Sequence, residues 1–182
     1  MSPRAKALML WGIAVLALGA LASGAGARIN VSGSIPVGLY WMTHAPVARN
    51  VYVVFCPPRF EIFEEAKRRG YIGPGFCEGG YGYMMKRVVA LEGDAVRIDG
   101  DGVRVNGLLV ECSAPRAQDK AGQALPQLRQ ALQLGHGEVL LMSDKSAEAF
   151  DARYFGPLDT RQIEAVIEPV WTWGGDNASV HC

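Results

Sequence analysis

An uncharged apolar segment near the N-terminus, residues 7–27, constrains this chain more than any other feature of its sequence. Arg4 and Lys6 precede it, and it has no visible polar face, which argues against a helix buried in a soluble core. As a helix the segment is about 30 Å long at ~1.5 Å per residue, enough to cross a bilayer. The preceding positive charges predict that the N-terminus lies in the cytoplasm and the rest of the chain outside it.

The apolar segment has two interpretations. Ala25-Gly26-Ala27 resembles the small-residue site at which a signal peptide is removed. We expect a retained membrane anchor, because the apolar segment is long for a signal peptide. The expected organisation is therefore an anchor or signal segment over residues 1–27 and one domain over residues 28–182, since a chain of 182 residues suits a single domain.

Short stretches rich in β-branched and aromatic residues dominate the rest of the chain and predict a mainly β domain. The expected strands are residues 37–42, 50–56, 84–91, 95–98, 103–105, 138–143 and 164–173.

Two helices and two loops are expected between these strands. One helix is predicted over residues 60–69, with Gly70 as its C-terminal stop, and a second short helix over residues 125–134. The glycine-rich stretch 73–82 and the polar stretch 113–120 are expected to be loops. Residues 57–82 would then form a small helical insertion in the β domain.

Charge and residue spacing exclude several classes of function. Lys+Arg and Asp+Glu balance at 18 each, so no overall charge draws the chain towards nucleic acid. The cysteines are scattered, and His44, His136 and His181 show no ligand spacing, so we expect no metal site and no cofactor. The absence of a Cys-x-x-Cys motif argues against a thioredoxin-like redox site.

The cysteines instead suggest a disulfide, which is permitted outside the cytoplasm. Four cysteines allow three full pairings. We expect Cys56 to pair with Cys77, because these two bracket the insertion, which has little core of its own. Cys112 and Cys182 are left either paired or free.

A candidate nucleophile, Ser34, lies in Ser32-Gly33-Ser34-Ile35-Pro36, soon after the apolar segment. The stretch from Ala27 to Ser34 spans at most ~25 Å, so a retained anchor would keep Ser34 near the membrane surface. Taken alone, Ser-Gly-Ser is more often an ordinary turn.

Lys86 favours a nucleophilic Ser34 over an ordinary turn, because this lysine lies in the apolar stretch Met84-Met85-Lys86-Arg87-Val88-Val89-Ala90. Burial would lower the pKa of the lysine, and a neutral amine can accept the proton of a serine nucleophile in place of histidine. The alternative is an exposed strand lysine beside Arg87, which periodicity alone does not exclude. Together, Ser34 and Lys86 favour a protease that works at a membrane surface.

A third block contains Asp144, Asp151 and Arg153. In an extended segment, Asp151 and Arg153 would share a face and could position the lysine region through charged hydrogen bonds. The alternative is a surface ion pair of little energetic value.

These three blocks, in this order, resemble the signal peptidase I superfamily of serine-lysine proteases. Ser32-Gly33-Ser34-Ile35-Pro36 looks like the nucleophile box of that superfamily, the segment from Met85 to Asp94 looks like the lysine box, and Ser143-Asp144 with the segment from Phe150 to Gly156 looks like the third box. The compact size, the continuation Pro36-Val37-Gly38-Leu39-Tyr40 and the cysteines flanking the insertion are most similar to conjugative transfer peptidases of the TraF type.

The resemblance implies a role for each site residue. Ser34 would be the nucleophile and Lys86 the general base, and Ser32 would contribute to the oxyanion hole beside the backbone N–H of Ser34. Asp144, Asp151 and Arg153 would support the site.

The third box departs from the family pattern. The usual Gly-Asp-Asn reads Ser143-Asp144-Lys145, and the usual Asp-Ser-Arg reads Asp151-Ala152-Arg153. Ala149 stands where signal peptidases commonly have a serine that supports the lysine. These changes affect the surroundings of Lys86, whereas Ser34 and Lys86 themselves match the family pattern.

The resemblance further implies a membrane-bound serine endopeptidase of the bacterial inner membrane with its catalytic domain in the periplasm. Its partner would be a membrane-inserted pilin or another exported precursor protein, released by hydrolysis or closed into a cyclic peptide. One alternative is a general type I signal peptidase. Another is a non-catalytic assembly factor of a pilus or secretion apparatus, which would need neither Ser34 nor Lys86.

Overall fold

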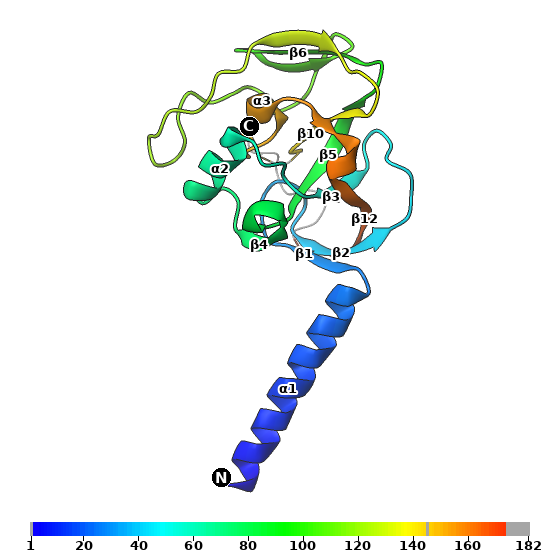
Figure 1. Ribbon diagram of the computed structural model, residues 1–182, viewed down its shortest axis with the longest axis vertical. Helices are drawn as coiled ribbons and strands as arrows, with labels where there is room; N and C mark the ends of the chain where they lie inside the picture. Colours follow the sequence, from blue (N-terminus) through cyan, green and yellow to red (C-terminus); the bar gives the residue numbers. More distant parts are fainter. Residues whose placement is uncertain (1, 145, 174–182) are drawn as a thin grey trace.

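A long N-terminal helix projects from a body of β-strands in the computed structural model, which describes residues 2–144 and 146–173 (Figure 1). This helix, α1 (Pro3–Gly24), contains an 18-residue stretch with a mean hydropathy of 2.0 and has no buried residue. Its length and composition suit a membrane span. The helix ends at Gly24 and not at Ala27 as expected, because Ala27 already pairs with Trp41 as the first residue of a strand.

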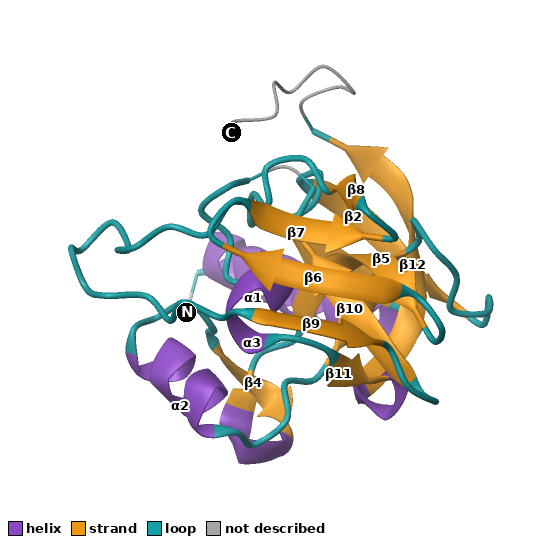
Figure 2. Ribbon diagram, turned by 90° about the horizontal axis from the view of Figure 1, so that it is seen from above, coloured by secondary structure: helices purple, strands orange, loops and turns teal. Residues whose placement is uncertain are grey.

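The larger of two antiparallel sheets formed by the described residues runs through the centre of the body (Figure 2). In spatial order it contains β1 (Ala27–Asn30), β2 (Gly38–Thr43), β12 (Ile163–Thr172), β3 (Tyr52–Phe55), β5 (Met84–Leu91), β10 (Glu138–Met142) and β11 (Leu158–Asp159). The smaller sheet contains β8 (Leu108–Leu109), β7 (Gly102–Val105), β6 (Ala95–Asp99) and β9 (Gln130–Gln133). The predicted mainly β fold is confirmed, and every predicted strand is present.

The insertion contains a helix, as predicted, but also more regular structure than expected. The helix is α2 (Glu61–Arg68), and Gly70 follows it with a φ of 77°. The glycine-rich stretch is not all loop, since it forms β4 (Pro74–Cys77) and a short 3-10 turn, η1 (Glu78–Gly80). A Cβ on Gly75 would lie 2.6 Å from the Cα of Gly82, so glycine here permits close approach of two backbone segments.

The helix predicted over residues 125–134 is wrong. That segment is extended and ends in β9, which pairs with β6 along the edge of the smaller sheet, with Ala95 opposite Gln133 and Val96 opposite Leu132. Leu134 is buried just beyond the strand. The unpaired edge of β6 and the adjacent core therefore override the local helical pattern.

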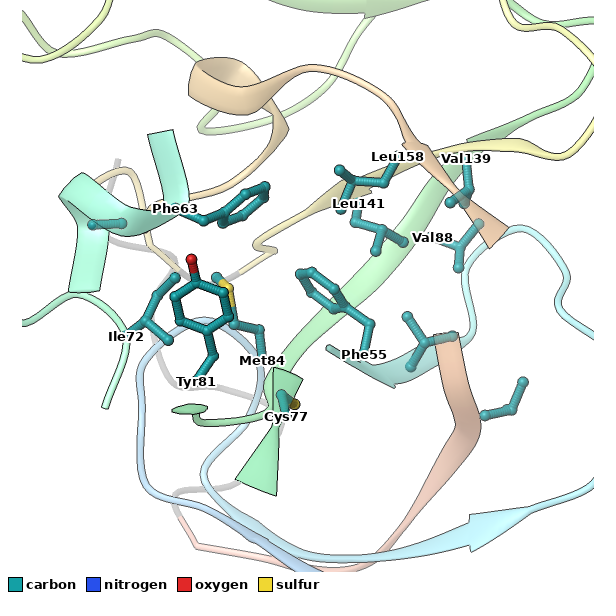
Figure 3. Close-up of a cluster of buried hydrophobic side chains, with 13 residues drawn as sticks. Phe55, Phe63, Ile72, Cys77, Tyr81, Met84, Val88, Val139, Leu141 and Leu158 are labelled. Carbon is teal, nitrogen blue, oxygen red and sulfur yellow. The ribbon is translucent and has the colours of Figure 1, made fainter. Parts of the chain in front are cut away.

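The insertion packs onto the main hydrophobic core and does not form one of its own. Figure 3 shows Phe63, Ile72 and Tyr81 from the insertion gathered in one cluster with Phe55 and Met84. The predicted disulfide is confirmed, because the sulfur atoms of Cys56 and Cys77 are 2.05 Å apart and join β3 to β4. Cys182 lies outside the described residues, so the expectation for Cys112 and Cys182 stays open.

The smaller sheet covers one face of the larger sheet through a second apolar cluster. Val96, Ile98 and Val103 from the smaller sheet pack against Ala90 and Leu140 from the larger one. Strands β5 and β10 are therefore covered on both faces, by the first cluster and by the second. A short helix, α3 (Ala152–Phe155), and a 3-10 turn, η2 (Thr160–Gln162), complete the described elements.

Candidate active site

Lys86 is buried in the larger sheet, as the sequence predicted. It lies in β5 between β3 and β10, opposite Val53, and its residue is only 2% exposed. Side chains alternate between the faces of a strand, so Lys86 shares its face with Met84 and Val88, both of which are buried in the main core. The alternative of an exposed lysine is excluded.

Ser34 lies in the loop between β1 and β2, and the fold brings this loop to the end of the Lys86 side chain. The Nζ atom of Lys86 and the Oγ atom of Ser34 are 2.6 Å apart, within hydrogen-bonding distance. Ser34 is half-buried, whereas the hydrocarbon chain of Lys86 is enclosed. The two candidate catalytic residues are therefore in direct contact.

Burial lowers the pKa of Lys86 from 10.5 to about 8. The carboxylates of Asp151 and Asp144 oppose this shift by favouring the ammonium form, and the guanidinium of Arg153 reinforces it. Slightly above neutral pH a large fraction of the amine is therefore uncharged, and its lone pair can accept the proton of the Ser34 hydroxyl.

Asp151 and Arg153 form a fully buried ion pair, which corrects both sequence-based interpretations of them. They do not lie in an extended segment, because Asp151 caps the N-terminus of α3 and accepts a hydrogen bond from the Arg153 backbone N–H at 3.2 Å. They are not a surface pair either, since both residues are 0% exposed and Arg153 Nε lies 2.8 Å from Asp151 Oδ1. Arg153 also donates to the carbonyl of Ala147 at 2.9 Å.

Hydrogen bonds made by Ser143, a residue of the third sequence block, connect this ion pair to the Ser34 loop. Asp151 Oδ2 accepts a hydrogen bond from the backbone N–H of Ser143 at 3.0 Å. The Ser143 hydroxyl in turn donates to the carbonyl of Ser34 at 2.7 Å, and the Asp144 backbone N–H donates to the same carbonyl at 3.2 Å. Asp144 uses its carboxylate differently, as the acceptor of the Tyr52 hydroxyl at 2.6 Å.

Ser32 lies in the same loop as Ser34, and its hydroxyl donates to Asn30 Oδ1 at 2.8 Å. Asn30 was not among the residues predicted from the sequence. Its Oδ1 also accepts from the backbone N–H of Ser32 at 3.1 Å, which makes an Asx-turn. The sequence signal that could have identified Asn30 is an asparagine two residues before a serine at the end of a strand.

A groove with a volume of about 720 Å³ opens onto Ser34 and Lys86. Its lining includes apolar side chains from Ile29, Val31, Tyr83 and Met84. Such a groove can accept an extended polypeptide with its carbonyl carbon beside Ser34. Among the described residues, no group of three or more His, Cys, Asp or Glu side chains gathers as a metal site would require.

The reactivity of Ser34 as a nucleophile is expected to rise with pH along a limb centred near pH 8. The sign follows from the base, because the Lys86 ammonium, which dominates below its pKa, cannot accept a proton. The pH dependence of kcat/KM reports the free enzyme and is the measurement that checks this. A limb near the ordinary lysine pKa of 10.5 would contradict the assignment of a buried, neutral base.

Comparison with known proteins gives the chain a family. The family model described as "Signal peptidase, peptidase S26" matches residues 5–173. The chain is 56% identical over 170 residues to an Escherichia coli protein named "Plasmid transfer protein TraF", covering 93% of this chain and 96% of that protein. It is 35% identical over 177 residues to "Conjugal transfer protein TraF" of Agrobacterium tumefaciens (strain 15955), covering 95% and 99%.

A crystal structure of a signal peptidase I from Enterococcus faecalis V583 superimposes with a TM-score of 0.41 at 18% identity, over 69% of this chain and 100% of the other. The family assignment does not use this structural similarity and rests on the match to the family model and on the identity to the TraF proteins. The chain therefore belongs to the signal peptidase family, peptidase S26, and within it to the TraF proteins of conjugal transfer.

Proposed function

We propose that this protein is a membrane-anchored serine endopeptidase in which Ser34 is the nucleophile and Lys86 the general base. The observation that carries the proposal is the 2.6 Å contact between Lys86 Nζ and Ser34 Oγ, made by a lysine that is almost completely buried. Burial lowers the pKa of this lysine to about 8, so a substantial fraction of its amine is uncharged at mildly alkaline pH, and its Nζ atom contacts the Ser34 hydroxyl that needs activation.

The reaction follows from these two groups. Ser34 Oγ attacks the carbonyl carbon of the scissile peptide bond while Lys86 Nζ takes the hydroxyl proton, and a tetrahedral oxyanion forms. The Ser34 backbone N–H and the Ser32 hydroxyl would stabilise this oxyanion if Ser32 turns away from Asn30. Lys86 then gives its proton to the leaving amine, the C–N bond breaks, and the N-terminal part of the substrate stays on Ser34 as an ester.

The second half of the reaction has two possible nucleophiles. Water activated by the neutral Lys86 would hydrolyse the ester and release a linear product. The free amine of the substrate part that is bound to Ser34 could instead attack the ester. This attack closes a cyclic peptide, and Ser34 regains its proton through Lys86. Both routes share the acyl-enzyme, and the mass of the product separates them because a cyclic peptide is lighter by one water.

The position of Ser34 supports a substrate with its own membrane segment. Only β1 and a short loop separate Ser34 from the end of α1 at Gly24. With α1 retained in the bacterial inner membrane and residues 28–182 in the periplasm, the scissile bond must lie near the outer face of that membrane. The relatives are named for plasmid and conjugal transfer, and we propose a pilin precursor as the membrane-inserted substrate in that process.

Deleting the gene from a conjugative element is expected to leave full-length pilin in the membrane and to stop pilus assembly and mating. Immunoblotting and mass spectrometry of pilin, together with mating frequency, check this.

Complementation of the deletion strain separates this proposal from the two alternative functions. Restored mating with Ser34→Ala would favour a non-catalytic assembly factor, and rescue of a cell lacking its housekeeping peptidase would favour a general signal peptidase. Normal pilin maturation in the deletion strain would refute the proposed substrate.

A further inference from the structure

We propose that Asn30 and Ser143 are positioning residues that hold the Ser34 loop from its two sides, so that the Ser34 hydroxyl stays in line with Lys86. Both residues are buried, at 4% and 1% exposed, and the hydrogen bonds of their side chains go to the Ser34 loop and not to Lys86. The inference rests on the proposed function, because it concerns how the same nucleophile is presented to its base.

Asn30 holds the Ser34 loop through hydrogen bonds to backbone carbonyls of the loop itself. Its Nδ2 atom lies 2.9 Å from the carbonyl oxygen of Ser32, 2.9 Å from that of Ile35 and 3.1 Å from that of Pro36. Three carbonyl oxygens around one end of the amide identify that end as the NH₂ group. One side chain thereby connects residues on both sides of Ser34 and closes residues 32–36 into a compact loop.

The chemistry of this position requires an amide. The NH₂ end donates its two hydrogens to the three carbonyls, one N–H being shared between two of them, and the oxygen end accepts the N–H and hydroxyl of Ser32. An aspartate has the same shape, but it would turn a second acceptor oxygen towards three carbonyl oxygens in a buried place. Asn30→Asp therefore removes the donors without changing the volume of the side chain.

Ser143, which follows β10, holds the Ser34 loop from a neighbouring segment of the domain. Its hydroxyl donates to the Ser34 carbonyl at 2.7 Å, and its own N–H is fixed at 3.0 Å by Asp151, the acidic member of the buried ion pair. The Ser34 backbone is thus tied to a rigid part of the domain. With the backbone fixed on both sides, rotation about the Cα–Cβ bond of Ser34 is the remaining freedom on the serine side of the contact between its Oγ and Lys86 Nζ.

The test compares full-length Asn30→Asp and Ser143→Ala with wild type and with Ser113→Ala. Ser113 is a matched control, because it is 2% exposed and also hydrogen-bonds backbone groups, the N–H of Val103 in the smaller sheet and the carbonyl of Val110 just after β8. The probe is a synthetic pilin-precursor peptide that keeps its membrane segment, in detergent micelles, at a temperature well below the Tm of every variant.

We expect Asn30→Asp and Ser143→Ala each to lower kcat by roughly 10- to 100-fold with KM little changed, since misplacing a nucleophile by about 1 Å is worth this much. Ser113→Ala should lower Tm to a similar extent and leave kcat unchanged. If Asn30→Asp does not fold, Ser143→Ala decides the outcome, because it removes a single hydroxyl.

Two outcomes would overturn the inference. One is a wild-type kcat in Ser143→Ala or in folded Asn30→Asp while Ser34→Ala is inactive. The other is an equal loss of kcat in Ser113→Ala, which would make the effect one of general stability. Activity in Ser34→Ala would instead refute the proposed function, so the two failures are distinguishable.

Discussion

Replacing Ser34 or Lys86 is expected to abolish precursor processing, with a loss of roughly 10⁴- to 10⁶-fold in kcat for either single change. In the proposed mechanism the two residues act as one catalytic unit through the 2.6 Å contact between Ser34 Oγ and Lys86 Nζ, and such a unit is disabled by loss of either part. The double variant Ser34→Ala/Lys86→Ala should therefore be no worse than either single variant. Mass spectrometry of the precursor peptide in micelles measures the remaining cleavage.

The choice of substitution separates lost chemistry from lost folding. Lys86→Ala leaves a cavity beside Met84 and Val88, whereas Lys86→Met fills nearly the same space with an apolar chain. We expect Lys86→Met to keep a wild-type circular dichroism spectrum and Tm while losing activity. Substantial cleavage by Ser34→Ala, Lys86→Ala or Lys86→Met would refute the assignment of the nucleophile and the base.

Removing Arg153 is expected to cause the largest loss of stability of any single substitution considered for this chain, about 3–5 kcal/mol. The change leaves the Asp151 carboxylate buried without its partner, in a place where neither residue has any exposed surface. The free energy of unfolding of full-length Arg153→Ala in micelles, from denaturant titration, measures this. Activity should fall as well, since Asp151 also holds the N–H of Ser143 beside Ser34.

The chain contains a matched control for this prediction in Asp159 and Arg161. This second pair has the same spacing and the same local geometry, because Asp159 accepts the Arg161 backbone N–H and lies 2.7 Å from its guanidinium. The difference is exposure, since 86% of the Arg161 side chain is open to solvent. Arg161→Ala should leave stability almost unchanged. Equal losses from Arg153→Ala and Arg161→Ala would show that burial of the first pair is not what stabilises it.

Local patterns in the sequence were sufficient for many of the elements. The strand over residues 84–91 is marked by apolar and β-branched residues between turn signals, and β5 has the same limits. The apolar composition of residues 7–27 predicted a membrane-spanning helix, and α1 fills most of that range. The pairing of Cys56 with Cys77 followed from their positions at the two ends of the insertion.

The failures share a different cause, which is contact between segments far apart in the chain. Residues 125–134 carry a helix-like pattern, but the open edge of β6 offers backbone hydrogen bonds that a local pattern cannot describe. The glycines of residues 73–82 looked like loop residues, although Gly75 and Gly82 serve close packing of two backbones. Gly38 is similar, because a Cβ there would overlap the carbonyl oxygen of Trp171 in β12.

For the candidate active site, too, local sequence predicts some features and contacts between distant segments decide the others. The sequence by itself identified the residues proposed to carry the chemistry, since Ser34 and Lys86 stand in motifs that resemble a known family. Only the tertiary structure decided their state: Lys86 is buried because two apolar clusters cover both faces of β5, and Asp151 and Arg153 are buried because α3 packs beneath the loop of Ser143. Burial depends on what covers a residue, and the covering segments come from distant parts of the chain. It is burial that lowers the pKa of Lys86 and makes the pair of Asp151 and Arg153 structural.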